Sequence, residues 1–264
     1  MEKAETNTLY EFSQYVDDAT CRYTREKLTI APSLRTTEFG DVAGFLAVDT
    51  TNQLLVLSFR GTRSVDTWIA NLDFAQEDIH DVCDGCSAHG GWWKSWQSVV
   101  DVLPSKIEAA VTDYPDYKLV FTGHSFGGAL AILGGTALRN AGYTIDLVRA
   151  SNTIECSHAM LTGIQYPFGS PRVGNEELAE YITAQGTLYR TTHTNDVVPK
   201  LPPGTWGYSH PAPEYWITSD NGATVTTGDV EVIQETNSTA GNAGTLGGSV
   251  LAHQAYFVNI SACP

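Results

Sequence analysis

The sequence predicts a single-domain α/β fold, with a mostly parallel central sheet and helices on both faces of that sheet. Predicted strands and helices alternate along the 264 residues, of which 42% are hydrophobic, enough for a sizeable core. No internal repeat or linker divides the chain, so residues 1–264 are expected to form one domain. The apolar run from Lys118 to Thr122 is typical of a strand that is buried on both faces.

The N-terminal part of the chain is predicted to contain one helix and a strand pair. Leu9 to Thr20 carries apolar residues at helical spacing, and the charged, irregular stretch from Tyr23 to Glu38 is expected to be a loop. Val42 to Val48 and Leu54 to Phe59 are predicted strands, and the polar residues 49–52 between them suit a hairpin turn.

The remaining elements follow from the same patterns. Trp92 to Tyr114 is a long helical region, in which Pro104 either starts a second helix or kinks the first. A helix after residue 125 is expected to run to Asn140, and Asn175 caps another from Glu176 to Ala184. Further strands, or parts of strands, are expected at residues 145–147, 166–172, 188–192, 215–218 and 230–234, and a flexible Gly/Ser/Thr/Asn-rich loop at residues 237–248.

The strand at residues 118–122 leads into the strongest chemical signal in the chain. It runs directly into Gly123-His124-Ser125-Phe126-Gly127, and a good helix-forming segment follows. Strand, tight turn and helix are the context that a nucleophile elbow requires, and the two glycines allow the strand and the helix to approach closely. A glycine-rich turn with an incidental serine is the alternative. The flanking elements favour a catalytic Ser125, whose hydroxyl would project at a helix N-terminus.

The charge of the chain restricts its partners. The formal net charge is −15 at pH 7, which argues against nucleic acid and against attraction to anionic membranes. No apolar run reaches the roughly 18 to 20 residues of a membrane span, so stable membrane insertion is not expected. Any contact with lipid must therefore be hydrophobic.

The five cysteines favour disulfides over metal or redox chemistry. Cys83 and Cys86 flank a turn sequence, without a second Cys-x-x-Cys or a thioredoxin-like strand, so a small loop-closing disulfide is expected. A bridge between Cys21 and Cys263 would join both ends of the chain and contribute about 3 to 5 kcal/mol in the chain-entropy model. Two bridges leave Cys156 free and indicate secretion.

Two further observations bear on secretion. Residues 1–5 lack the apolar segment of a signal peptide, so a signal either has been removed or was never present. Sequons at Asn237 and Asn259 are compatible with secretion.

A catalytic serine needs a base to accept its proton and an acid to orient that base. In the chain order Ser, acid, His, the candidate acid that follows a strand directly is Asp196. Spacing alone does not separate His253 from His210 as the base. The full sets of downstream candidates are His158, His193, His210 and His253 for the base, and Glu155, Asp196, Glu214 and Asp220 for the acid.

An ordered set of motifs resembles the filamentous-fungal class 3 lipases, the group of the Thermomyces and Rhizomucor lipases and the related feruloyl esterases. The matching segments are VLSFRGT (56–62), GHSFGGA (123–129), GSPRVGN (169–175), THTNDVVP (192–199), PEYWI (213–217) and AH (252–253), and the similarity covers nearly the whole chain. The resemblance implies a single-domain α/β hydrolase with a short helical lid.

The resemblance also implies a set of catalytic roles. Ser125 is then the nucleophile, Asp196 the acid and His253 the base, while Thr62 and the backbone N–H of Phe126 form the oxyanion hole. Family members more often carry Leu after the nucleophile, and Phe126 is expected to alter the shape of the pocket more than its chemistry. No metal or cofactor is needed. The expected partner is a lipid or ester substrate at an oil–water interface, and the expected state is a monomer.

A short amphipathic helix near residue 65 has two interpretations. Val65, Trp68 and Ile69 lie at helical spacing, which also suits an ordinary helix over the core. The resemblance identifies Val65 to Asn71 as the lid. Trp68 and Ile69 would cover the serine in water and turn toward lipid at an interface, which predicts interfacial activation. Feruloyl esterases have a more polar segment here, so the apolar residues favour a lipase.

Residues 148–165 have no counterpart in the family. Joining Leu147 to Tyr166 restores an uninterrupted family strand, so the segment is either a natural surface loop or an intron translated as protein. It is expected to leave the sheet on the side away from Ser125, with Tyr166 to Gly169 completing the strand. Its removal is predicted to leave activity intact.

Together these observations predict a secreted triacylglycerol lipase or a close carboxylester hydrolase that forms an acyl-enzyme. One alternative is a feruloyl esterase. Another is a catalytically inactive relative that binds lipid or carbohydrate, and the intact positions 125, 196 and 253 argue against it.

Overall fold

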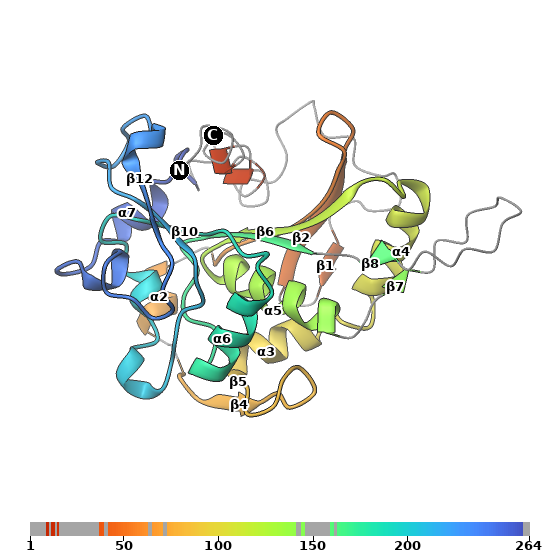
Figure 1. The fold of residues 1–264 in the computed structure, drawn as a ribbon, viewed down its shortest axis with the longest axis horizontal. Coiled ribbons are helices and arrows are strands. Elements are labelled where there is room, and N and C mark those ends of the chain that lie inside the picture. Colours follow the sequence, from red (N-terminus) through yellow and green to blue (C-terminus); the bar gives the residue numbers. More distant parts are fainter. Residues whose placement is uncertain are drawn as a thin grey trace, which may run out of the picture.

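The computed structural model describes residues 9–10, 12–13, 15, 37–39, 42–62, 65–70, 73–140, 144–145, 159–160 and 163–260. For residues 37–39, 66–68, 144–145 and 159–160 it describes the backbone alone. The arrangement of these parts is shown in Figure 1. Among the described helices, none has the length and apolar character needed to cross a membrane.

An eight-stranded sheet forms the centre of the molecule, in the order β1-β2-β3-β6-β9-β10-β11-β12. The five strands from β3 to β11 in this order pair in parallel, and the pairs β1–β2, β2–β3 and β11–β12 are antiparallel. The strands are β1 (Thr37–Phe39), β2 (Val42–Asp49), β3 (Leu54–Phe59), β6 (Lys118–His124), β9 (Ile164–Phe168), β10 (Arg190–His193), β11 (Glu214–Ile217) and β12 (Val230–Ile233). The predicted α/β class with a mostly parallel sheet is confirmed.

Helices and short 3-10 turns connect these strands. The α-helices whose bounds lie within the described residues are α2 (Val65–Ala70), α3 (Gly90–Gln97), α4 (Leu103–Asp113), α5 (Phe126–Asn140), α6 (Glu176–Ala184) and α7 (Val250–Gln254). The 3-10 turns are η1 (Val198–Lys200), η2 (Gly204–Trp206), η3 (Thr227–Asp229) and η4 (Asn242–Gly244). Two small hairpins lie outside the main sheet: β4 (Gln76–Asp78) with β5 (Ser87–His89), and β7 (Thr144–Ile145) with β8 (Ala159–Met160).

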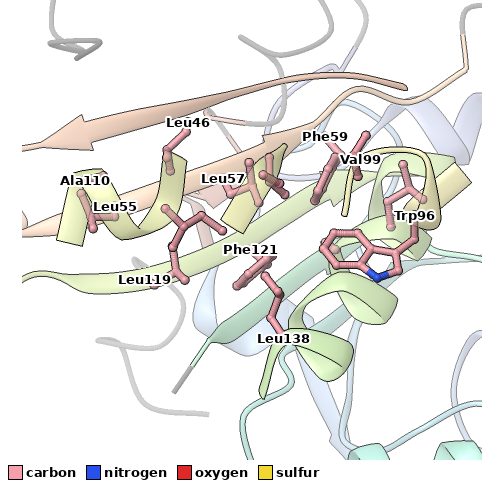
Figure 2. Close-up of a cluster of buried hydrophobic side chains, with 14 of the residues drawn as sticks. Leu46, Leu55, Leu57, Phe59, Trp96, Val99, Ala110, Leu119, Phe121 and Leu138 are labelled. Carbon is pink, nitrogen blue, oxygen red and sulfur yellow. The ribbon is translucent and has the colours of Figure 1, made fainter. Parts of the chain in front are cut away.

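Both faces of the sheet are buried, as the apolar strand sequences predict. Along β6, Leu119 and Phe121 pack with α3, α4 and α5, as Figure 2 shows, whereas Val120 packs into the cluster on the opposite face. That second cluster contains residues from both ends of the chain, among them Phe12 and Ile260. Alternate residues of a strand point to opposite faces, so continuous apolar runs are what a sheet covered on both sides requires.

Two helix starts agree with the sequence signals. Pro104 lies in the first turn of α4, and α3 ends before it, so this proline starts a second helix. Asn175 caps α6, because its side-chain oxygen accepts a hydrogen bond from the backbone N–H of Leu178 at 3.1 Å.

Two boundaries differ from the prediction. The stretch assigned as loop up to Glu38 ends in strand β1, which pairs with β2. The strand expected to restart at Tyr166 already begins at Ile164, because Ile164 and Gln165 pair with β6. Gln165 is buried, and its side chain donates to Thr136 Oγ1 at 3.3 Å, so it belongs to the core and not to the insertion.

Of the rest of the insertion, the structure describes residues 159–160, which form β8, and residue 163. Strand β7, which was expected to lead into the main sheet, pairs instead with β8 in a separate antiparallel hairpin. This hairpin lies at the end of the molecule opposite α7 (Figure 1). Residues 146–158 lie outside the described residues, so the effect of deleting the segment stays a prediction.

The short disulfide that the cysteine spacing predicts is present. Cys83 and Cys86 are bonded, and Gly85 between them adopts a φ of 71°, a left-handed conformation that glycine accommodates. Cys21, Cys156 and Cys263 lie outside the described residues.

Candidate active site

Ser125 has the strained backbone that a nucleophile elbow requires. Its φ is 58°, in the left-handed region that non-glycine residues rarely adopt. The flanking glycines are a steric necessity: a Cβ at Gly123 would lie 2.3 Å from the backbone of Gly127, and one at Gly127 would lie 2.2 Å from Phe59 O. Strand β6, helix α5 and the end of β3 therefore meet at this serine.

Asp196 and His253 form a buried pair beside the same edge of the sheet. His253 Nδ1 lies 3.0 and 2.9 Å from the two carboxylate oxygens of Asp196, and both side chains are fully buried. A carboxylate only accepts hydrogen bonds, so Nδ1 carries a proton and Nε2 is the ring nitrogen left to accept one. The carboxylate also accepts a hydrogen bond from the backbone N–H of Val198, at 2.8 Å.

Several contacts place Ser125 and His253 around one point. The backbone N–H of Ser125 donates to Phe168 O at 2.9 Å, and a Cβ at the next residue, Gly169, would lie 3.0 Å from the His253 ring. The ring of His124, adjacent to the serine, packs at a tilt against the ring of His253, with centroids 4.2 Å apart. Within the described part of the chain, Ser125 Oγ and His253 Nε2 are buried polar atoms without a hydrogen-bond partner.

The end of β3 supplies the neighbouring wall. A Cβ at Gly61 would lie 3.4 Å from Ser125 Cβ, so Gly61 lies directly beside the serine side chain, and Thr62 follows it in the chain. Helix α2 begins at Val65, and its Val65 and Ile69 side chains are half-buried. The side chain of Trp68 lies outside the described residues.

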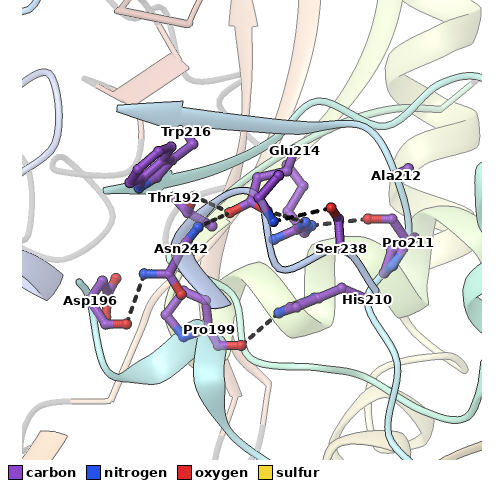
Figure 3. Close-up of polar contacts among 12 residues, drawn as sticks. Thr192, Asp196, Pro199, His210, Pro211, Ala212, Glu214, Trp216, Ser238 and Asn242 are labelled. Carbon is purple, nitrogen blue, oxygen red and sulfur yellow. Dashed lines mark hydrogen bonds and ion pairs between the residues drawn. The ribbon is translucent and has the colours of Figure 1, made fainter. Parts of the chain in front are cut away.

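The composition of residues 237–248 predicts a flexible loop, but in the structure this loop makes specific buried contacts. Asn242 is buried, its backbone N–H donates to Glu214, and its side-chain amide donates to the backbone oxygen of Asp196 at 3.0 Å (Figure 3). A Cβ at Gly241 would lie 2.7 Å from Glu214, so the small residues here permit close packing. The loop that leads to α7 and His253 is therefore anchored on Glu214 and Asp196.

The other candidate histidine, His210, lies elsewhere in this polar network. Its Nε2 donates to Pro199 O at 2.7 Å, as Figure 3 shows, and it is buried. Burial, and then the positive charges of Arg190 and Arg172, hold its pKa well below the usual value. The geometry therefore pairs Asp196 with His253 and leaves His210 in a structural role.

Two residues of the site were not singled out from the sequence. Tyr256 is buried and donates its hydroxyl to Asp196 Oδ2 at 2.5 Å; burial and the negative charge of Asp196 raise its pKa, so it stays a donor. His124 Nε2 donates to the backbone oxygen of His253 at 2.7 Å, and burial keeps the pKa of His124 well below the usual value. The position of Tyr256, three residues after His253, was the only available signal.

We expect Tyr256→Phe to lower kcat about tenfold and to leave KM within twofold. The substitution removes one donor from the carboxylate that orients His253, and a hydrogen bond to a charged group contributes roughly 1.5 to 3 kcal/mol. The measurement is steady-state kinetics on a soluble ester. Tyr189→Phe is the matched control, because Tyr189 stacks on Tyr166 and Tyr215 away from Asp196. An unchanged kcat in Tyr256→Phe would remove the tyrosine from this role.

A strained serine at a strand–helix elbow, with an acid–histidine pair at the carboxyl edge of a parallel sheet, is the arrangement of an α/β-hydrolase serine hydrolase. The family model described as Lipase (class 3) matches residues 56–206. The secreted mono- and diacylglycerol lipase A of Penicillium cyclopium is 45% identical over 225 residues, which are 84% of this chain and 68% of that protein. The chain belongs to the class 3 lipase family, and it is a secreted carboxylester hydrolase.

Solved structures give the same result over nearly the full length. A crystal structure of a mutant form of MDLA from Penicillium cyclopium has a TM-score of 0.83 and 38% identity, covering 99% of each chain. The mono- and diacylglycerol lipase from Aspergillus oryzae has a TM-score of 0.82 and 33% identity, covering 97% of this chain and 98% of that one.

Proposed function

We propose that the protein hydrolyses acylglycerols through a covalent acyl-enzyme formed on Ser125. His253 Nε2 accepts the proton of the serine hydroxyl while the serine oxygen attacks the ester carbonyl, and the same imidazolium then donates a proton to the departing alcohol. Asp196 holds the Nδ1–H tautomer and stabilises the imidazolium. The observation that carries this proposal is the buried Nδ1 to carboxylate contact of 2.9 Å beside the strained serine.

Two residues, Phe126 and Thr62, are proposed to donate the hydrogen bonds that stabilise the oxyanion. Phe126 is the first residue of α5, so its backbone N–H has no partner within the helix and can donate to a developing negative charge. Thr62, next to Gly61, supplies its backbone N–H and hydroxyl from the end of β3. Water activated by His253 then hydrolyses the acyl-enzyme.

The substrate class rests on the named relatives. The proteins from Penicillium and Fusarium solani are named secreted mono- and diacylglycerol lipases. We therefore propose monoacylglycerols and diacylglycerols as substrates, in addition to the triacylglycerols expected from the sequence.

The test is hydrolysis of mono-, di- and triolein emulsions beside methyl ferulate. Release of oleate with no turnover of methyl ferulate supports a lipase. Preferential cleavage of the ferulate ester would establish a feruloyl esterase instead.

Helix α2 is proposed to be the lid, with Val65, Trp68 and Ile69 as its apolar contacts. Activity is then expected to rise once substrate exceeds its solubility and forms an interface. We expect Trp68→Ser to reduce emulsion hydrolysis about fivefold or more while changing soluble-ester turnover less than twofold, because only the open lid exposes this residue to lipid. Equal losses on both substrates would assign Trp68 to packing.

Two further expectations complete the proposal. A monomer is expected, and sedimentation measures it directly. A disulfide between Cys21 and Cys263 is expected beside Cys83–Cys86, and peptide mapping without reduction should recover both bridges with Cys156 free.

A further inference from the structure

Three large apolar side chains are clearly the most exposed ones in the described part of the chain. Leu246, Leu251 and Trp206 have exposed fractions of 93%, 70% and 57%. The other exposed large hydrophobic residues in that part are Tyr10, Val100 and Val102, at 38% to 45%. Single exposed apolar residues are ordinary on a protein surface. Several highly exposed ones on the same side of the molecule indicate an interaction surface.

Leu246 lies on a turn that leads into a segment paired with Asp196. Ser249, three residues later, forms a parallel bridge with Asp196, and its backbone N–H donates to Asn195 O at 2.9 Å. A Cβ at Gly248 would lie 2.9 Å from the side chain of Val197. The turn that presents Leu246 therefore packs directly against the segment containing Asp196.

This turn is held rigidly from inside. The ammonium group of Lys200 donates to Thr245 O and to Gly247 O, each at 2.6 Å, so the carbonyls on both sides of Leu246 are fixed. Thr245 is also held, because its hydroxyl donates to Asn242 O at 2.8 Å. An apolar side chain on a preorganised turn loses little backbone entropy when it binds a surface.

Leu251 and Trp206 are placed by α7 and by the segment that follows α2. Leu251 lies on α7, two residues before His253. The ring of Trp206 packs edge-on against Phe74 with centroids 4.8 Å apart, and Phe74 follows α2 closely in the chain. Figure 1 shows α2 and α7 at the same end of the molecule, opposite α4.

We propose that Leu246, supported by Leu251 and Trp206, is a fixed apolar anchor that docks the enzyme on a neutral acylglycerol surface. This anchor is separate from the lid: α2 governs access to Ser125, and the Leu246 turn governs adsorption. The net charge of −15 leaves apolar contact as the attraction to such a surface and disfavours an anionic one. The inference rests on the proposed acylglycerol hydrolysis and adds the step that precedes it.

The experiment measures adsorption to diolein droplets by flotation, in a Ser125→Ala background that removes turnover. Leu246→Ser is expected to weaken adsorption about tenfold, or about 1.4 kcal/mol. Leu246→Met, which keeps an apolar side chain, is expected to stay within twofold. Val102→Ser is the matched control, because Val102 is 44% exposed between α3 and α4. With Ser125 intact, Leu246→Ser is expected to hydrolyse a soluble ester within twofold of the parent.

Three results would contradict the proposal that Leu246 is an anchor: unchanged adsorption of Leu246→Ser, an equal loss in Val102→Ser, or stronger adsorption when anionic lipid is added to the droplets.

Measuring adsorption in the absence of turnover separates this inference from the proposed function. If native protein adsorbs through Leu246 but releases no oleate, the hydrolytic assignment fails and the anchor stands. If it releases oleate while Leu246→Ser adsorbs normally, the anchor alone fails.

Discussion

Replacing His253 with alanine is expected to lower kcat/KM on a soluble ester by about 10⁴-fold, whereas His210→Ala should retain activity within tenfold. His253 Nδ1 contacts Asp196, and in the proposed mechanism the loss of this imidazole removes the base from Ser125. His210 donates to a backbone oxygen and lies among arginines, where it supports the fold. The measurement is kcat/KM for both variants.

Thermal unfolding provides the control for this comparison. His253→Ala should unfold cooperatively with a transition near that of the parent, and His210→Gln, which keeps a donor, should be more stable than His210→Ala. An active His253→Ala protein would show that the base has been misassigned. An inactive but folded His210→Ala protein would identify the other histidine.

Asp196→Asn is expected to lower kcat by roughly 10³- to 10⁴-fold while leaving the fold intact. The amide is nearly the same size as the carboxylate but cannot accept from His253, Tyr256 and Val198 together while it also carries donors of its own. The imidazole then loses its fixed Nδ1–H tautomer, and the imidazolium loses its counter-charge. The measurement is the burst and steady-state rate on a chromogenic ester.

The matched control for this variant is Asp113→Asn, an exposed residue at the end of α4, which should behave like the parent. A kcat within tenfold of the parent for Asp196→Asn would mean that the carboxylate is not required to orient His253.

Much of the fold follows from local signals in the sequence. The glycines around Ser125 specify close approach between β6 and α5, because any Cβ there would overlap the backbone of a neighbouring element. Pro104 and Asn175 mark the starts of α4 and α6, because each satisfies a requirement of the first helical turn. Apolar strands covered on both faces indicate a mostly parallel sheet.

Other features depend on contacts that no local pattern reveals. A Gly-rich composition predicts a flexible loop at residues 237–248. This loop is anchored instead, because Asn242 and Gly241 pack on Glu214, which is distant in the sequence. The choice between His253 and His210 depends on which segment returns to Asp196, and spacing does not determine this. The family resemblance pointed to His253, and the geometry brings the same residue to Asp196. Tyr256 was missed because a tyrosine in an apolar run indicates core packing, not a hydrogen bond to the acid.

The most direct test of the catalytic assignment is covalent labelling of the native enzyme with an alkyl fluorophosphonate, followed by intact-mass measurement and peptide mapping. The phosphonyl group resembles the tetrahedral intermediate, so it should react with the one activated hydroxyl. We expect one label per chain, on Ser125, with loss of esterase activity in proportion to labelling and no labelling of Ser125→Ala. A label on another residue accompanied by inactivation, or full activity after complete modification of Ser125, would contradict the account.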